Sequence, residues 1–211
     1  MIVLLVVSCA RYLSRLDRWK DWENRHQTEL ARNDIEIAYV IGRPCEPSLA
    51  TAPGWSNLHA LDVGDEYEDL PEKVLLAFQW VRETYDRIEG VFKTDDDIVF
   101  DVSILNYIRL LGWVPYWALQ NGHIFHQQIH DHVYARASRP LEVKALEKCV
   151  HALGRGYYVN QHCIEILTED IAASTALSYH EDYLVGLLLN RHNIFPVDFG
   201  FLLAPHYRLP G

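Results

Sequence analysis

Continuous apolar runs and helical spacing alternate along the first half of the chain. Ile2–Val7 is an unbroken run of β-branched and other apolar residues, and Ile35–Ile41 is apolar except at Glu36; both are typical of buried strands. Residues 11–31 are charged and contain no glycine or proline, which predicts a helix between these strands. Residues 70–85 carry apolar side chains at helical spacing, and Pro71 suits the first turn of a second helix.

The later part of the chain continues the alternation with shorter elements. We expect further strands at 58–61, 91–94, 113–119 and Tyr157–Asn160, helices at 101–111, 141–153 and 181–190, a loop at 42–57, a mixed segment with a hairpin at 120–140 and a loop-like tail from Phe195. This order predicts an α/β fold, with a mostly parallel central sheet flanked by helices. Ligands of such folds bind at the carboxyl ends of the strands.

The length of 211 residues suits one domain over 1–211. Hydrophobic residues make up 49% and charged residues 23%, so we expect a globular protein and not a disordered one. The chain ends at Pro210-Gly211, so this domain can also be the N-terminal domain of a longer protein. The net charge of −10 argues against nucleic acid as a partner, because that binding needs Lys and Arg to neutralise phosphates.

Two further features bear on location. The apolar start is too short for a membrane span and lacks a basic segment before it, and no other run approaches about 20 apolar residues. The four cysteines, Cys9, Cys45, Cys149 and Cys163, form no C-x-x-C pair, and no N-x-S/T sequon is present. We therefore expect no membrane span, free thiols and a cytoplasmic location.

Three adjacent carboxylates, Asp95-Asp96-Asp97, end the predicted strand at 91–94, and apolar residues follow them. Like charges at a strand end raise one another's pKa, and a divalent cation removes that penalty. Mg²⁺ and Mn²⁺ take oxygen ligands and keep positions open for substrate phosphates. Asp95 and Asp97 can face the same side of the turn while Asp96 turns away or supports them. The alternative is a solvated acidic turn or helix cap.

Four segments carry a family resemblance, in the right order along the chain. Lys93-Thr-Asp-Asp-Asp-Ile-Val-Phe100 resembles the "KTDDDvFv" segment of the β-1,3-galactosyltransferase and Fringe-like family of GT-A glycosyltransferases. Residues 62–73 resemble that family's "DFxDsYxNLTxK", residues 154–159 its "GxGYvlS", and residues 181–186 its "EDVyvG". The resemblance implies a GT-A-like single domain.

The resemblance also implies roles for single residues. Asp97 would bind Mn²⁺ (or Mg²⁺), Asp95 would lie toward the metal and the nucleotide, and His206 would complete the metal site. Asp182 would take the proton from the acceptor hydroxyl, and Lys73 would lie near the donor phosphates. Each has a plainer alternative: a surface or capping role for His206, a helix N-terminal carboxylate for Asp182 and a surface charge for Lys73.

The remaining candidates surround the expected nucleotide. Cys9, Ala10 and Arg11 follow the first strand, where GT-A folds seat the base and diphosphate. Asp62 and Asp65 are nucleotide-binding or loop-capping residues, and Asp96 joins Asp95 as a donor-site residue. A group of histidines suggests an acceptor-binding loop better than a metal site, because its spacing fits no zinc pattern; these are His123, His126, His130 and His132.

The expected function is metal-dependent, inverting transfer of a hexose or deoxyhexose from a UDP-sugar to a glycan or glycoprotein hydroxyl. Asp69 and Pro71 stand where the family has the Asn and Thr of "NLT", so the preferences of the animal enzymes do not transfer. The anchorless form resembles glycosyltransferase domains of large chlorella viruses, which implies capsid glycosylation in the host cytoplasm. The alternatives are a metal-dependent nucleotidyltransferase or phosphohydrolase, which also use strand-end aspartates, and a non-catalytic carbohydrate-binding domain.

Overall fold

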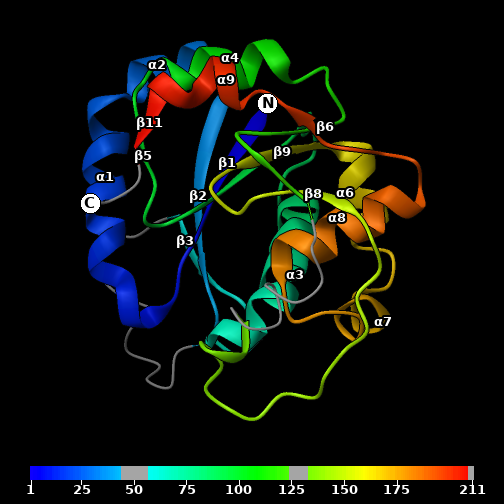
Figure 1. Ribbon diagram of the computed structural model, residues 1–211. Coiled ribbons are helices and arrows are strands. Elements are labelled where there is room, and N and C mark those ends of the chain that lie inside the picture. Colours follow the sequence, from blue (N-terminus) through cyan, green and yellow to red (C-terminus); the bar gives the residue numbers. More distant parts are fainter. Residues whose placement is uncertain (44–56, 124–132, 209–211) are drawn as a thin grey trace.

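A seven-stranded sheet forms the centre of the computed structural model, which describes residues 1–43, 57–123 and 133–208. The strand order is β10-β6-β9-β4-β1-β2-β3 (Figure 1). The strands are β1 Ile2–Val7, β2 Ile35–Ile41, β3 Leu58–Ala60, β4 Gly90–Asp95, β6 Tyr116–Ala118, β9 Tyr157–Asn160 and β10 Val197–Asp198. Strand β9 is antiparallel to both of its neighbours, and the other six share one direction. The predicted α/β fold with a mostly parallel sheet is confirmed.

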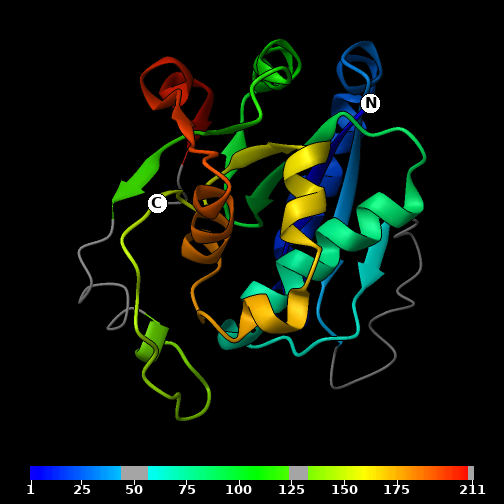
Figure 2. The ribbon, with the colours of Figure 1, turned by 90° about the vertical axis from the view of Figure 1, so that its right-hand side faces the viewer.

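Helices cover both faces of this sheet, and the side chains of β1 divide between them. Val3, Leu5 and Val7 pack into a hydrophobic cluster with α3, α6 and α8, whereas Ile2, Leu4 and Val6 pack into a second cluster with α1, α2 and α4. Figure 2 shows α3, α6 and α8 in front of the sheet. The helices are α1 Leu13–Arg25, α2 Gln27–Arg32, α3 Leu70–Thr84, α4 Ile104–Leu111, α6 Gln161–Leu167, α7 Ile171–Thr175 and α8 Glu181–Arg191. Burial on both faces explains why β1 is apolar at every position.

Shorter elements complete the described part of the chain. Two small antiparallel sheets form, from β5 Val99–Phe100 with β11 Tyr207–Arg208 and from β7 Asn121–His123 with β8 Val150–Ala152. Single turns of helix are η1 Ala10–Tyr12, η3 Tyr67–Asp69, α9 Gly200–Leu203 and η4 Ala204–His206. No helix of the described ranges has both the length and the apolarity that a membrane crossing requires.

The helix predicted at 141–153 is wrong. The backbone of 141–149 is irregular, and β8 follows it and pairs with β7. Val143 is 78% exposed, so a helix here would have left part of its apolar side in water. Tertiary contacts outweigh helix propensity instead, since the hydroxyl of Tyr183 binds both the N–H and the carbonyl of Glu147.

Other boundaries also differ from expectation. The helix predicted at 11–31 is divided into η1, α1 and α2, with a break at His26, and the helix predicted at 101–111 begins only at Ile104. Helices α6 and α7 lie where no element was predicted, and the tail from Phe195 contains β10, α9, η4 and β11. The pattern missed these elements because each is too short to show a clear period.

Three of the four cysteines are free thiols in the structure, as expected: Cys9, Cys149 and Cys163. Cys45 lies outside the described residues, as do most of the loop predicted at 42–57 and the histidines at 126, 130 and 132. His123 belongs to β7.

Gly186 allows α8 to lie directly on β8. A Cβ atom at this position would be 2.4 Å from Cβ of His151 and 3.0 Å from the carbonyl oxygen of Val150. Distances this short mean that any larger residue must push the helix away from the strand. The glycine of the segment at 181–186 is therefore a packing requirement of the helix that begins at Glu181.

Gly186→Ala should destabilise the protein by about 1–3 kcal/mol, the usual cost of overpacking. Helix propensity alone predicts the opposite sign, a gain of about 1 kcal/mol. The free energy of unfolding in urea measures the difference. Gly112→Ala is the matched control, because its Cβ would meet the flexible Cδ1 of Ile2 at 3.3 Å and its φ is already helical at −60°. A Gly186→Ala variant as stable as the wild type would contradict the close packing.

Candidate functional site

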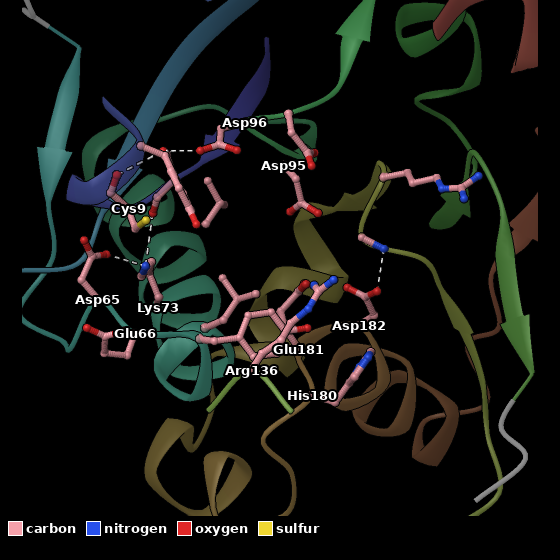
Figure 3. Close-up of a pocket in the computed structure, with 18 of the residues that line it drawn as sticks. Cys9, Asp65, Glu66, Lys73, Asp95, Asp96, Arg136, His180, Glu181 and Asp182 are labelled. Carbon is pink, nitrogen blue, oxygen red and sulfur yellow. Dashed lines mark hydrogen bonds and ion pairs between the residues drawn. The ribbon is translucent and has the colours of Figure 1, made fainter. Parts of the chain in front are cut away.

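A cleft of about 1000 Å³ opens at the carboxyl ends of β1 and β4 (Figure 3). These strands are parallel neighbours with Val7 opposite Asp95, so the segments that follow them emerge side by side. The cleft walls come from within residues 7–15, 65–73, 95–97, 151–155 and 180–182, with Gly122 and Arg136. The position agrees with the expectation for an α/β sheet.

Asp95 ends β4 and lies on the floor of the cleft. Its Oδ1 accepts a hydrogen bond from Nζ of Lys93 at 2.7 Å. About 40% of its side chain reaches the solvent of the cleft, yet protein atoms enclose the rest closely. Burial and the negative charge of Glu181 raise the pKa of Asp95 to about 6, against the opposing effect of Lys93.

Asp96 supports the turn. Its two carboxylate oxygens accept hydrogen bonds from Oγ of Ser8 at 2.6 Å and from the guanidinium of Arg15 at 3.1 Å. Its backbone carbonyl accepts a third from Nε1 of Trp19 at 3.1 Å. These contacts leave Asp96 buried and tie the acidic turn to β1 and α1.

Asp97 is half-buried and lines the same cleft. Across the residues that the structure describes, no side chain donates a hydrogen bond to its carboxylate. Asp95 and Asp97 therefore offer hard oxygen donors to the cleft, which fit a cation such as Mn²⁺ or Mg²⁺. In the described ranges no three His, Cys, Asp or Glu side chains are grouped to hold a metal ion. A cation here would complete its ligand set from phosphates and water, as Mg²⁺ commonly does.

A buried ionic cluster lies beneath the floor. The ammonium of Lys93 has no exposed surface and bridges Asp95 to Glu181, whose Oε2 is 2.9 Å away. The hydroxyl of Tyr157 donates to the other oxygen of Glu181. Burial alone would raise the pKa of Glu181, but the charge of Lys93 and these hydrogen bonds hold it well below its usual range.

Asp182 lies in the first turn of α8, directly beside this cluster. The backbone N–H of Gly154 donates to its Oδ2 at 2.6 Å. Burial, then the charge of Glu181 and a hydrogen bond with it, raise the pKa of Asp182 well above its usual range. A Cβ on Gly154 would be 2.9 Å from Oδ1 of Asp182 and 3.0 Å from Oδ2 of Asp95. The glycine thus brings two sequence-predicted carboxylates to one place.

Lys73 and Asp65 form a framework on the side of the cleft that follows β1. The ammonium of Lys73 is 2.5 Å from Oδ1 of Asp65 and 3.2 Å from the carbonyl oxygen of Ser8. Asp65 also accepts from the backbone N–H groups of Ala10 at 2.5 Å and Gly42 at 2.7 Å. Lys73 is 2% exposed, so its charge holds the ends of β1 and β2 together as well as lining the cleft.

The other candidates divide between cleft and surface. Cys9 and Arg11 line the cleft. Asp62 does not: its side chain is 81% exposed and pairs with Arg43 at 2.8 Å. His206 is also outside the cleft lining, with Nδ1 at 2.7 Å from Oγ of Ser103. Neither Asp62 nor His206 lines the cleft, and their roles in binding stay predictions.

Several contributors had not been singled out from the sequence: Ser8, Arg15, Lys93, Tyr157 and Glu181. Lys93 left a usable signal, because a lysine inside an apolar strand must find a buried partner. Its partner Glu181 lies 88 positions away along the chain, and no local pattern indicates that pairing.

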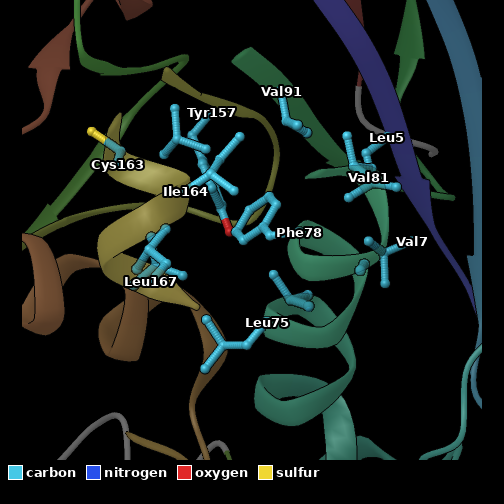
Figure 4. Close-up of a cluster of buried hydrophobic side chains, with 14 of the residues drawn as sticks. Leu5, Val7, Leu75, Phe78, Val81, Val91, Tyr157, Cys163, Ile164 and Leu167 are labelled. Carbon is cyan, nitrogen blue, oxygen red and sulfur yellow. The ribbon is translucent and has the colours of Figure 1, made fainter. Parts of the chain in front are cut away.

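Hydrophobic packing fixes the strand ends that carry the site. Val7 lines the cleft and also belongs to the core on the α3 side of the sheet. Figure 4 shows this core, with Phe78 of α3 and Ile164 of α6 packed beneath β1, β4 and β9. The site is thus built on packed elements, with Asp95 at the last position of β4 and Asp182 in the first turn of α8.

Two comparisons with known proteins bear on this site. The family model described as Galactosyltransferase matches residues 19–199. The match includes the acidic turn, Gly154 and Asp182. A search of curated proteins gives no match to the chain.

Lys93→Met should cost about 3–5 kcal/mol of folding free energy, because it leaves buried carboxylates without their cation. Adding Glu181→Gln should restore part of this loss, since the uncompensated charge is then removed. Urea unfolding of the two single variants and the double variant measures the coupling. The control Lys148→Met, at an exposed position, should change stability by less than about 0.5 kcal/mol. Additive losses in the double variant would disprove the pairing.

Proposed function

The chain belongs to the galactosyltransferase family and is a glycosyltransferase, and from this premise we propose a specific reaction. The protein transfers a hexose or deoxyhexose from a UDP-sugar to a hydroxyl of a glycan or glycoprotein, with inversion and with Mn²⁺ or Mg²⁺. One observation carries the proposal: Asp95, at the end of β4, and Asp182, at the start of α8, meet around Gly154 in one cleft.

In the donor half of the cleft, carboxylates would repel a bound diphosphate, and a cation would remove that repulsion. Asp95 and Asp97 face the place where a diphosphate would bind, in a protein of net charge −10. Two like-charged groups repel strongly in a partly enclosed site. A divalent cation held by these two carboxylates supplies neutralisation of the diphosphate, both in the donor and in the departing nucleotide. Arg11 lines the same half and adds positive charge.

The acceptor half needs a proton acceptor, and Asp182 suits that role. The acceptor oxygen forms its bond to the anomeric carbon while the bond from that carbon to the diphosphate oxygen breaks. The hydroxyl proton passes to the carboxylate of Asp182, and the electron pair of the broken bond leaves with UDP. The N–H of Gly154 holds one oxygen of Asp182 in place. A single displacement of this kind inverts the anomeric centre.

Two alternative functions are outcomes that experiment can distinguish from this proposal. The family match favours glycosyl transfer over a nucleotidyltransferase or phosphohydrolase reaction. A non-catalytic carbohydrate-binding domain would bind sugar without transfer. The likeness to chlorella virus domains makes a capsid glycoprotein the acceptor and the host cytoplasm the location that we propose.

UDP should bind at least about tenfold more weakly when a chelator replaces Mn²⁺, a difference of ~1.4 kcal/mol. The physical reason is the unrelieved repulsion between the diphosphate and the acidic turn. Asp97→Ala should remove the metal-dependent part of the affinity, and Asp86→Ala, at an exposed position away from the cleft, should keep it. Titration calorimetry with UDP measures the wild type and both variants, each with Mn²⁺ and with chelator. Equal affinity with Mn²⁺ and with chelator would exclude the metal role.

Asp182→Asn should lower the rate of transfer by on the order of 10²–10⁴-fold, the usual contribution of a general base. Donor affinity should barely change, since Asp95 and Asp97 remain. Parallel measurements of UDP-sugar affinity and transfer rate separate the two effects. If Asp182 merely stabilised the start of α8, Asn would replace it well and turnover would stay near normal.

A further inference from the structure

An irregular segment, residues 133–149, brings an arginine to the cleft from outside the sheet. Its anchor is Glu68 of η3, whose side chain has no exposed surface. Glu68 accepts hydrogen bonds from the N–H of Ser138 at 3.1 Å and from its hydroxyl at 2.6 Å, and Arg139 lies 3.5 Å away. A buried carboxylate with these partners is costly to release, so this end of the segment is held firmly.

Arg136 lies two residues before Ser138 and lines the cleft (Figure 3). Its guanidinium carbon is 5.5 Å from the ring centroid of Tyr67, another cleft residue. Burial and the charges of Asp182 and Asp95 raise the pKa of the Tyr67 hydroxyl, whereas Arg136 opposes the rise. Arg136 and Tyr67 thus lie next to each other in the lining of the cleft.

Arg136 differs from most cations around it in having no carboxylate partner among the described residues. Arg15, Lys73 and Lys93 each form an ion pair with a carboxylate. Within the described ranges Arg136 forms no such pair, although acidic side chains line the same cleft. Arg155 also lacks a carboxylate partner there, but its guanidinium donates to Oε1 of Gln120 at 2.7 Å. A guanidinium held in a cleft without a counter-ion is suited to an anion carried by a ligand.

We propose that Arg136 is an anion-binding residue of the cleft, which takes a phosphate or carboxylate group of the bound ligand, and that Glu68 is the residue that positions it. The inference rests on the proposed function insofar as the cleft is the donor and acceptor site. Two ligands can supply the anion: the diphosphate of the donor or an acidic sugar of the acceptor. A planar guanidinium binds either group through two parallel hydrogen bonds.

Binding measurements test this without any transfer reaction. Titration calorimetry with UDP, inorganic pyrophosphate and glucuronate compares the wild type with Arg136→Gln, Arg136→Lys and the control Arg87→Gln. Arg87 is exposed and outside the cleft, so its substitution changes net charge equally and should leave all affinities unchanged. Arg136→Gln should lose roughly tenfold or more for one class of anion, and Arg136→Lys should lose less, since it keeps the charge without the fork.

The pattern of loss identifies the source. A loss confined to UDP and pyrophosphate assigns Arg136 to the donor diphosphate, and a loss confined to glucuronate assigns it to an acidic acceptor sugar. Wild-type affinities in Arg136→Gln, or no measurable binding of any of these anions to the wild type, would overturn the proposal. Anion binding that depends on Arg136 in a protein without transferase activity would overturn the proposed function alone.

Glu68 is tested through its dependence on Arg136. Glu68→Gln should weaken binding of the same anion, because the segment loses its charged anchor. In the Arg136→Gln background the Glu68→Gln change should have no further effect on affinity. A thermal melt of each variant confirms that the fold is retained. A loss from Glu68→Gln that persists without Arg136 would show that Glu68 does not act through it.

Discussion

The ammonium of Lys93 is the group on which the arrangement of the cleft depends. Removing a charge from water costs several kcal/mol, so this lysine requires carboxylates at short range. It finds them in Asp95 on its own strand and Glu181 on α8, and Tyr157 of β9 binds the second oxygen of Glu181. One buried charge thus fixes a helix end against two strands, and Asp182 follows as the next residue of that helix.

Two glycines also determine how closely the elements around the cleft approach one another. Gly154 leaves room for the carboxylates of Asp95 and Asp182 to approach the same point, and Gly186 lets α8 lie on β8. Membership of the galactosyltransferase family agrees with this construction, because glycosyl transfer brings a donor and an acceptor together in one cleft. The excess of carboxylates in the cleft makes positive charge from a cation or from arginines a condition of binding a diphosphate.

The strands and the acidic turn were predictable because their signals are local. A strand buried on both faces is apolar at nearly every position, which marked Ile2–Val7 and Ile35–Ile41 with the bounds that the structure shows, Glu36 being the one exposed exception. The carboxylates of the triplet interrupt such a run, and Asp95 and Asp97 do line the cleft. The helix prediction at 141–153 was wrong because helix propensity is a local preference. Contacts of residues 141–149 with Tyr183 override it.

Local pattern therefore specified all strands of the central sheet except β10, the helices α3 and α8, and the acidic turn. It could not specify which distant groups meet, because pairings across the fold depend on sheet order and helix packing. The approach of Asp182 to Asp95, the burial of Lys93 with Glu181, and the absence of His206 from the cleft lining all arise at that level. The same is true of Arg136, which lies two residues before Ser138, and Ser138 binds a buried carboxylate in an element far from it in sequence. Burial and charge compensation are properties of the folded chain, because they arise only when the helices pack against the sheet.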